Sequence, residues 1–345
     1  MENPEIDIVV LNYNGKKFLD DCFQSLQQST YPNKHIYLLD NASPDDDVEW
    51  VRQHYPWVKI IQNPYNNGYC AAYNLAFEQC KSKYLICLNN DVVVDKHWLE
   101  PMIELAESNP NIGAIQPKIL AIKSPEYFEY AGASGGLIDK YGFPFMRGRV
   151  FDTLEKDLGQ YNDTAHIFWA SGAAMMVNKE ALKHSGTLDE VIVHHMDEID
   201  LCWRLLLSGY EIRVQPNSFI YHVGGATISA KSFKKTYWNH RNSIYMMLKN
   251  YGFKNMICRT FVHILLDYVA LAQALVTGQF EVARGIFMAH IWLIGHMGLI
   301  AKERKKVQVR RKVSDKIVDK NMYQGSIVWA YFGKKIKTYQ QLINK

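Results

Sequence analysis

The sequence lacks both common phosphate-binding motifs, because neither GxGxxG nor GxxxxGKS/T occurs in its 345 residues. A dinucleotide-binding loop and a P-loop are therefore excluded. Cysteine is scarce: its six residues are scattered without a CxxC pair, which argues against a zinc cluster and favours a reduced, cytosolic protein. The formal net charge of +4 is too small to indicate a nucleic-acid partner. Met1 to Glu5 has no charged or apolar signal segment, so we expect no export signal there.

What the sequence does have is a series of short apolar strands that end in polar residues. The clearest is Tyr84-Leu-Ile-Cys-Leu-Asn-Asn-Asp91, which is short enough for a strand buried on both faces. An unpaired carboxylate is costly inside such a strand, so Asp91 should emerge at its carboxyl end. The polar residues that end the first four predicted strands are Asn12, Asp40, Asn63 and Asn89 to Asp91.

Helical patterns separate these strands, as in the stretch from Phe18 to Leu26. Alternation of strand and helix predicts a largely parallel, doubly wound sheet, with all four polar strand ends along one edge. Ser43 should cap the second helix. Further strands are predicted at Gly113–Ile119 and Tyr210–Tyr221, and residues 127–163 should form an irregular excursion.

The C-terminal part is helical, with two apolar segments at Ile257–Thr277 and Val282–Ile300. Each is about long enough to span a bilayer, but internal charges such as Asp267 are costly at the bilayer centre. Helices that lie in the membrane interface fit better, and the basic run Lys302–Lys312 would attract anionic lipid. The alternative is a helical hairpin that caps the core beside a solvated charge run.

Two groups of polar residues have both a structural and a chemical interpretation. Asp197 and Glu198 begin a predicted helix, where the helix dipole stabilises negative charge, or one of them is a general base. Asp200 should form a surface ion pair with the residue four positions later. Asp91 and His222 are either structural or share a divalent cation, Mg²⁺ or Mn²⁺, with a diphosphate.

Five motifs resemble, in order, those of family 2 inverting glycosyltransferases, and in particular their rhamnosyltransferase-like branch. The likeness covers roughly residues 6–249. The motifs are Val9-Val-Leu-Asn-Tyr-Asn-Gly15, Leu39-Asp-Asn-Ala-Ser43, Asn67-Gly-Tyr-Cys-Ala-Ala-Tyr-Asn74, Leu88-Asn-Asn-Asp91 and Asp197-Glu-Ile-Asp-Leu-Cys-Trp-Arg204.

The resemblance implies a GT-A fold, a nucleotide-diphosphate sugar donor and a divalent cation. It implies a metal site at Asp91, His222 and Asn89, where Asn89 replaces the first Asp of the family's Asp-x-Asp motif. The base falls on Glu198, with Asp197 second, because the family's Glu-Asp order is reversed here. Residues implied to contact the donor are Asn12, Asp40, Asn67, Gly68, Asn74, Asn90 and Arg241, and residues 169–172 would form the acceptor wall.

These inferences predict a glycosyltransferase domain at residues 1–250, with a nucleotide half to about 115 and an acceptor half from about 116. Residues 251–345 would be a helical, basic extension that associates with the inner face of the cell membrane. The expected reaction transfers rhamnose or another hexose to a saccharide or lipid-linked acceptor in surface polysaccharide synthesis. The alternatives are a sugar-nucleotide pyrophosphorylase, which shares this sheet architecture, and a non-catalytic membrane-associated scaffold.

Overall fold

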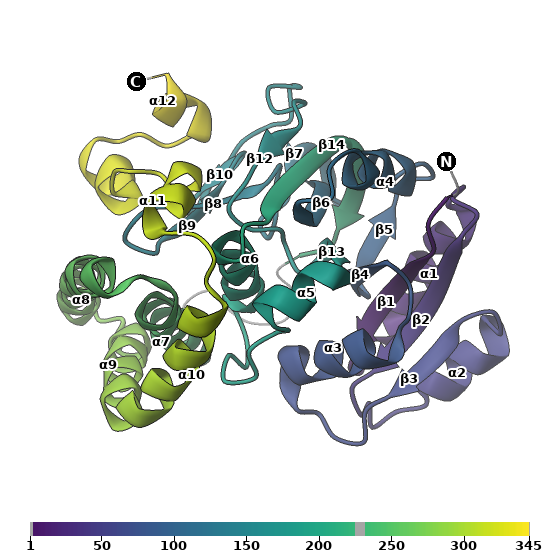
Figure 1. The fold of residues 1–345 in the computed structure, drawn as a ribbon, viewed down its shortest axis with the longest axis horizontal. Coiled ribbons are helices and arrows are strands. Elements are labelled where there is room, and N and C mark those ends of the chain that lie inside the picture. The colour runs from purple at the N-terminus through teal and green to yellow at the C-terminus, as the bar shows by residue number, and fades with distance from the viewer. Residues whose placement is uncertain (1–2, 225–231, 345) are drawn as a thin grey trace.

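The computed structural model describes residues 3–224 and 232–344 (Figure 1). Residues 1–2, 225–231 and 345 lie outside it, and with them the first two residues of the N-terminal stretch considered above. The main sheet contains β1 (Ile6–Asn12), β2 (Lys34–Asp40), β3 (Lys59–Gln62), β4 (Tyr84–Asn89), β5 (Val92–Val94), β6 (Ile112–Ala121), β7 (Ser124–Phe128), β12 (Ala165–His166), β13 (Ala174–Asn178) and β14 (Glu211–His222). Its helices are α1 (Lys16–Gln28), α2 (Asp47–His54), α3 (Gly68–Gln79), α4 (Leu99–Ser108), α5 (Lys179–Ser185) and α6 (Asp197–Leu207).

The sheet has the order β12-β14-β6-β13-β4-β1-β2-β3. Strands β1 to β4 are parallel to one another, β13 runs antiparallel to β4 and β6, and β14 is parallel to β6. The prediction of a mostly parallel sheet with helices on both faces is therefore confirmed. One antiparallel strand in its middle separates the two parallel sets.

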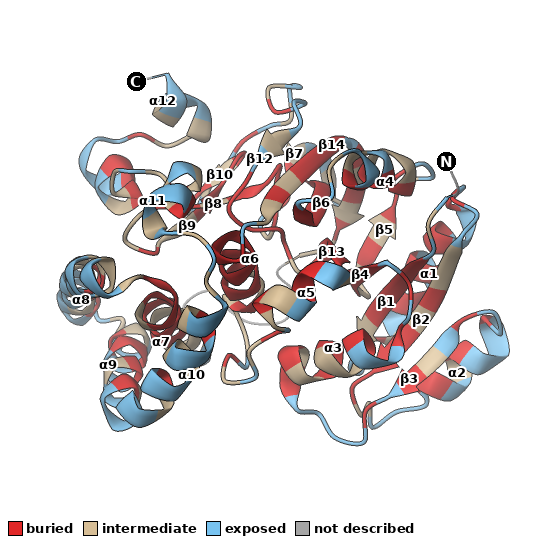
Figure 2. Ribbon diagram, in the orientation of Figure 1, coloured by how far each residue is buried: buried red, intermediate tan, exposed pale blue. Residues whose placement is uncertain are grey.

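Alternating residues of the strands build two cores, one on each face. Ile8 and Val10 pack with residues of α1, α2 and α4. Val9 and Leu39 pack with residues of α3, α5 and α6 on the opposite face. Figure 2 shows that α6 is buried along almost its whole length. Because α6 is enclosed by other elements, the residues at its N-terminus have fixed surroundings.

Two local predictions were wrong. Ser43 does not cap the second helix, because α2 begins only at Asp47; the Ser43 hydroxyl instead accepts a hydrogen bond from the backbone N–H of Asn14 at 2.9 Å. Residues 127–163 are not simply irregular. They contain a small antiparallel sheet formed by β8 (Gly136–Ile138), β9 (Pro144–Met146), β10 (Arg149–Val150) and β11 (Thr153–Leu154).

The last part of the C-terminal helical region packs against the body of the protein. The elements of the whole region are α7 (Phe233–Asn250), α8 (Phe253–Val276), α9 (Phe280–Gly295), α10 (Met297–Arg310), α11 (Asp315–Val318), η1 (Asp319–Asn321), η2 (Trp329–Gly333) and α12 (Tyr339–Ile343). Ile327 and Tyr331 pack against Phe145 and Val150 of the small sheet. The last segment thus covers the small sheet and is not a free extension.

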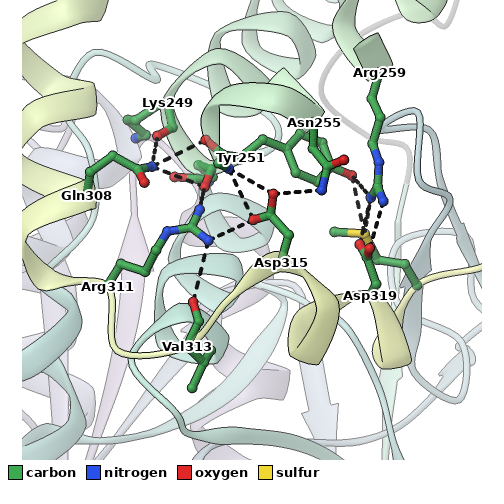
Figure 3. Close-up of polar contacts among 12 residues, drawn as sticks. Lys249, Tyr251, Asn255, Arg259, Gln308, Arg311, Val313, Asp315 and Asp319 are labelled. Atoms are coloured by element: carbon green, nitrogen blue, oxygen red, sulfur yellow. Dashed lines mark hydrogen bonds and ion pairs between the residues drawn. The ribbon is translucent and has the colours of Figure 1, made fainter. Parts of the chain in front are cut away.

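The basic run is partly structural, which differs from the free lipid-binding patch that the sequence suggested. Figure 3 shows Gln308 and Arg311 beside the C-terminal end of α7. Gln308 Nε2 donates to the Lys249 carbonyl at 2.9 Å, and Arg311 donates to the Asn250 carbonyl. Arg304 donates to the Tyr251 carbonyl at 2.6 Å. These side chains satisfy carbonyl groups that a helix end leaves without partners.

Helix α8 is long and apolar enough to cross a membrane. Helices α9 and α10 meet that criterion only when counted together across a bend of 74°. Figure 2 shows that α8 and α9 are exposed along one side. The exposed large apolar side chains of these two helices are Phe253, Ile257, Phe261, Leu265, Tyr268, Val269, Leu275, Val276, Phe280, Phe287, Met288, Ile291 and Ile294.

Candidate active site

The polar ends of the parallel strands meet at one edge of the sheet, as predicted. Asn12 lies opposite Asp40 in the β1–β2 pairing, and Leu11 lies opposite Asn89 in the β1–β4 pairing. The backbone N–H of Asn63 donates to the Asp40 carbonyl at 2.8 Å, which continues the same edge to β3. Side chains from four sequence-distant segments are therefore neighbours at the position where open α/β sheets bind ligands.

A hydrogen-bond network joins the loops that follow β1 and β4. Asn12 is fully buried; its Nδ2 donates to Asp47 Oδ2 at 2.7 Å, and its Oδ1 accepts from Asn90 Nδ2 at 2.8 Å. Gly15 N also donates to Asp47 Oδ2, at 3.0 Å. A Cβ atom at Gly15 would lie 2.0 Å from Asn90 Nδ2, so this position requires glycine. The amides of Asn12 and Asn90 thus support the loops, and the direct donor contact that the resemblance implied for them stays a prediction.

One carboxylate oxygen of Asp40 is buried without a hydrogen-bond partner among the described residues. Its side chain is 3% exposed, and Oδ2 accepts from the backbone N–H of Ser43 at 3.2 Å. Oδ1 is buried and has no hydrogen-bond partner in the part of the chain that the structure describes. Buried polar atoms are nearly always paired, so an orphaned acceptor at a strand end is a feature of a binding site.

Helix α3 presents its N-terminus at the same edge. Asn67 is its N-cap residue, and Gly68 follows with φ +87°, a conformation that glycine adopts without strain. The Asn67 side chain accepts from Asn63 Nδ2 at 3.1 Å. The N-terminal N–H groups of a helix favour an anionic ligand. Asn67 and Gly68 therefore lie at the same sheet edge as Asn63 and Asp40, and their contact with the donor stays a prediction.

Asn74 lies further along α3 and is occupied by the protein. Its Oδ1 accepts from Leu188 N at 3.0 Å, and its Nδ2 donates to Glu190 Oε1 at 2.9 Å. Both ends of the amide hold the loop before α6. Asn74 therefore supports this loop, and the donor contact that the resemblance implied for it stays a prediction.

His222 at the end of β14 joins two carboxylates. Its Nε2 lies 3.1 Å from Asp91 Oδ1 and its Nδ1 lies 3.2 Å from Glu129 Oε2. Burial alone would lower the pKa of His222, but its contacts with Asp91 and Glu129 outweigh burial and raise the pKa to about 9. Asn89 Nδ2 is 3.4 Å from the same Nε2.

The donor chemistry of this group suits a divalent cation that is shared with a ligand. Among residues 3–224 and 232–344, no group of three or more His, Cys, Asp or Glu side chains is arranged to hold a metal by itself. Asp91 and His222 Nε2 nevertheless face each other, and Glu129 contacts the other ring nitrogen, as carboxylates do behind histidine ligands. Mg²⁺ is commonly bound by one or two carboxylates together with substrate phosphates.

Asp197 and Glu198 form a close carboxylate pair at the start of α6. The two preceding residues, His195 and Met196, have φ of 63° and 67°, an uncommon conformation for residues other than glycine. Burial, and then the nearby Glu198 carboxylate, raises the pKa of Asp197 well above its usual value. Burial also raises the pKa of Glu198. Two crowded carboxylates with raised pKa values are typical of acid–base chemistry.

Gly172 connects this pair to the sheet edge. A Cβ atom at Gly172 would lie 2.7 Å from the Tyr69 hydroxyl and 4.0 Å from Glu198 Cβ. The next residue, Ala173, accepts a hydrogen bond from Asn89 N at 3.0 Å. Glu198 therefore lies near the end of β4 that carries Asp91. Of the expected acceptor wall, Trp169 is in the core and donates from Nε1 to the Leu137 carbonyl.

Asp200 forms the expected pair with Arg204, but the pair is buried and not at the surface. Arg204 Nε donates to Asp200 Oδ2 at 2.8 Å, and both side chains are almost completely enclosed. Lys249 Nζ also donates to Asp200, at 2.9 Å. Asp200 is thus part of a structural ion cluster and takes no part in the carboxylate pair.

Arg241 reaches the loop before α6 and does not reach the sheet edge. Its guanidinium donates to the Val191 carbonyl at 2.8 Å and to Asn242 Oδ1 at 2.7 Å. It stacks over the Trp292 ring, with 4.6 Å to the centroid. These contacts hold the guanidinium beside the loop before α6, and the contact with the donor that the resemblance implies stays a prediction.

The sequence did not identify Asp47 or Glu129 as members of the site. Glu129 lay within the stretch expected to be irregular. Their roles depend on pairing with Asn12 and His222, which are distant in sequence. Only the tertiary structure brings these partners together.

Comparison with known proteins agrees with this geometry. Residues 7–186 match the family described as "Glycosyl transferase family 2". The poly-beta-1,6-N-acetyl-D-glucosamine synthase of Staphylococcus epidermidis is 23% identical over 77% of this chain and 64% of its own length. The N-acetylglucosaminyl-diphospho-decaprenol L-rhamnosyltransferase of Mycobacterium tuberculosis is 24% identical over 63% of this chain and 75% of its own. This chain thus spans about two thirds of the synthase.

Solved structures share the fold. The mannosyltransferase PcManGT from Pyrobaculum calidifontis, solved with GDP-Man and Mn²⁺, superposes with a TM-score of 0.53 at 13% identity and covers 90% of this chain and 86% of its own. That level of identity shows the fold alone. The sheet, the C-terminal helical region and the sequence match together confirm the predicted GT-A fold. The chain belongs to glycosyl transferase family 2.

Proposed function

We propose that this protein is an inverting glycosyltransferase that moves rhamnose or another hexose from a nucleotide-diphosphate donor to a saccharide or lipid-linked acceptor. The observation that carries the proposal is the carboxylate pair of the buried Asp197 and the half-buried Glu198. Gly172 lies between this pair and the strand end that carries Asp91. A proton acceptor beside a candidate diphosphate site is the arrangement that displacement at a sugar carbon requires. The names of the relatives from Staphylococcus and Mycobacterium support a role in surface polysaccharide synthesis.

Glu198 is the proposed general base. Burial raises the pKa of both carboxylates, so the pair takes up a proton more readily than a free carboxylate, and the resemblance places the proton acceptor at Glu198. As the acceptor hydroxyl oxygen bonds to C1 of the sugar, its proton passes to Glu198. The bond from C1 to the diphosphate oxygen breaks on the opposite side, so the anomeric centre inverts and a nucleoside diphosphate leaves.

The donor site is proposed at the sheet edge. The unpartnered oxygen of Asp40 accepts hydrogen bonds from the nucleoside, and the N-terminus of α3 at Asn67 and Gly68 faces the anionic part of the donor. Asp91 and His222 would hold a divalent cation, Mg²⁺ or Mn²⁺. When bound, this ion offsets the negative charge that develops on the departing diphosphate.

The exposed apolar face of α8 and α9 is the proposed contact with the cytosolic side of the cell membrane. Two charged residues in the body of α8 point into the protein: Arg259 pairs with Asp319 at 2.6 Å, and Asp267 pairs with His290 at 2.9 Å; Lys254, at the start of the helix, is exposed. The outer face therefore carries large apolar side chains without these charges, as an interfacial helix does. This position would place the enzyme beside a lipid-linked acceptor.

The test of activity is turnover of candidate UDP-, dTDP- and GDP-linked sugars with Mn²⁺, with products identified by chromatography. We expect release of nucleoside diphosphate that is lost in Glu198→Gln. Glu180→Gln is a matched control, because Glu180 is exposed on α5 and pairs only with its neighbour Lys183. Release of pyrophosphate would instead identify a pyrophosphorylase, and full activity of Glu198→Gln would refute the assignment of the base.

The test of membrane contact is flotation with vesicles that contain anionic lipid. Phe261 and Leu265 are 60% and 49% exposed, so Phe261→Asp with Leu265→Asp should reduce flotation without loss of folding. Leu158→Asp is the control, because Leu158 is 83% exposed on a loop outside the C-terminal helices. Equal flotation of both variants would refute a lipid contact at this face. Deletion of the C-terminal region is unsuitable, because that region supports α7 and the small sheet.

A further inference from the structure

The turn that leads into the carboxylate pair is held in an unfavourable conformation. His195 and Met196 both have positive φ, and neither is glycine. Such a conformation is costly for residues other than glycine and persists only where the surroundings fix it. Because Asp197 follows directly, any relaxation of this turn would move both carboxylates.

Asn242 of α7 contacts the start of this turn. Its side chain is fully buried, and its Nδ2 donates to the His194 carbonyl at 2.7 Å and to the His195 carbonyl at 3.0 Å. Its Oδ1 accepts from Arg241 Nε at 2.7 Å, which fixes the orientation of the amide. One side chain thus satisfies two adjacent backbone carbonyls at the start of the strained turn.

Other side-chain contacts fix the earlier part of the same loop. Cys70 Sγ donates to the Ile192 carbonyl at 2.9 Å, and Asn74 holds Leu188. Arg241 reaches Val191. These contacts position the loop as a whole, whereas the bonds to His194 and His195 come from Asn242.

We propose that Asn242 is a positioning residue for glycosyl transfer, because it holds the His195–Met196 turn and thereby sets the place of Asp197 and Glu198. The proposal rests on the proposed role of Glu198 as the base. Asn242 acts through the backbone of the loop, and its hydrogen bonds are with His194, His195 and Arg241. The C-terminal helical region is thereby a part of the catalytic apparatus.

The experiment compares Asn242→Ala with a matched control, Asn250→Ala. Asn250 lies on the same helix, is equally buried and donates to Asp200 Oδ1 at 2.9 Å, away from the turn. Both variants lose a buried amide, so a general loss of stability should affect both. Asn242→Ser, which keeps a single short donor, is measured in parallel in case the alanine variant does not fold.

For Asn242→Ala we expect kcat for nucleoside-diphosphate release to fall by about 10- to 100-fold, because a misplacement of about 1 Å can cost 100-fold. The donor KM should stay within about 3-fold, since Asp40 and α3 are untouched. The acidic limb of the pH profile should move to lower pH, because a looser turn hydrates and separates Asp197 and Glu198 and lowers their pKa values toward normal. Asn250→Ala should keep the acidic limb of the wild-type pH profile.

The two proposals fail in different ways. If Glu198→Gln is inactive while Asn242→Ala and Asn242→Ser retain wild-type kcat and acidic limb, the positioning role is refuted and the base assignment stands. An equal fall of kcat in the Asn242 and Asn250 variants, with unchanged pH profiles, would also refute the positioning role. The lower kcat would then reflect a general loss of stability. Full activity of Glu198→Gln would instead refute the proposed function itself.

Discussion

Glu198 and Asp200 lie within one turn of α6. We expect the neutral substitutions Asp200→Asn and Glu198→Gln to have opposite effects on the stability of the fold at pH 8. Asp200 is fully buried and accepts from Arg204 and Lys249 at 2.8 and 2.9 Å. In Asp200→Asn the two cations would face only one buried carboxylate, that of Asp189. Breaking a buried pair in this way costs about 3–5 kcal/mol. For a protein of this size that corresponds to a fall in Tm of about 4–7 °C if unfolding is two-state.

Glu198→Gln should have no such cost. The pKa values of Glu198 and Asp197 are raised by burial and, for Asp197, by the neighbouring carboxylate. The folded protein therefore binds protons more tightly than the unfolded chain, so stability falls as pH rises from about 4 through the raised pKa values. Glu198→Gln removes one of the two carboxylates and therefore part of this loss of stability at high pH. Glu198→Gln should equal the wild type at low pH and be more stable than it at pH 8.

The assay is thermal unfolding of both variants at pH 5 and pH 8, combined with turnover at pH 8. We expect Asp200→Asn to be destabilised at both pH values, and Glu198→Gln to be inactive but at least as stable as the wild type at pH 8. An unchanged Tm in Asp200→Asn would show that the ion cluster around Asp200 contributes little to stability. If Glu198→Gln lost as much stability as Asp200→Asn, Glu198 would be structural and the reasoning would be refuted.

Three further predictions concern the donor site and the C-terminal helices. Asp91→Ala should abolish the Mn²⁺-dependent part of donor affinity in calorimetry, and unchanged affinity with Mn²⁺ present would contradict its role. Asp40→Asn should raise donor KM by about 10-fold or more with little change in kcat, because a lost charged hydrogen bond is worth about 1.5–3 kcal/mol; steady-state kinetics would check this, and a fall in kcat alone would contradict it. Asp267→Asn should lower Tm but leave vesicle flotation intact, because Asp267 accepts from His240 and His290 inside the helical region and is not on its outer face.

The sequence predicted the sheet edge because the relevant signals are local. Asn12, Asp40 and Asp91 each follow directly on an apolar strand, and parallel strands bring their carboxyl ends together. The supporting partners could not be predicted in this way. Asp47 and Glu129 act on Asn12 and His222 across long sequence separations, and no local pattern specifies such pairs.

The small sheet at residues 136–154 was missed for a related reason. Its strands have two to three residues each, which is too short for a recognisable alternation of apolar side chains. Much of its core comes from the far end of the chain, where Ile327 and Tyr331 pack on Phe145. A segment that lacks a core of its own gives little sequence signal until its distant partner is known.

The apolar segments at residues 257–300 show how a count of charges along a helix can mislead. The sequence contains Arg259, His263 and Asp267 within one segment, and these charges argued against a span. In the structure all three face inward: Arg259 pairs with Asp319, while His263 and Asp267 are buried. Their cost in lipid is thus already removed by contacts within the protein. These three charges therefore do not argue against the proposed contact of the outer face of α8 with lipid. Helices α8, α9 and α10 also contact α7, whose Asn242 donates to the His194 carbonyl near the carboxylate pair, so the proposed membrane contact would have to leave this packing in place.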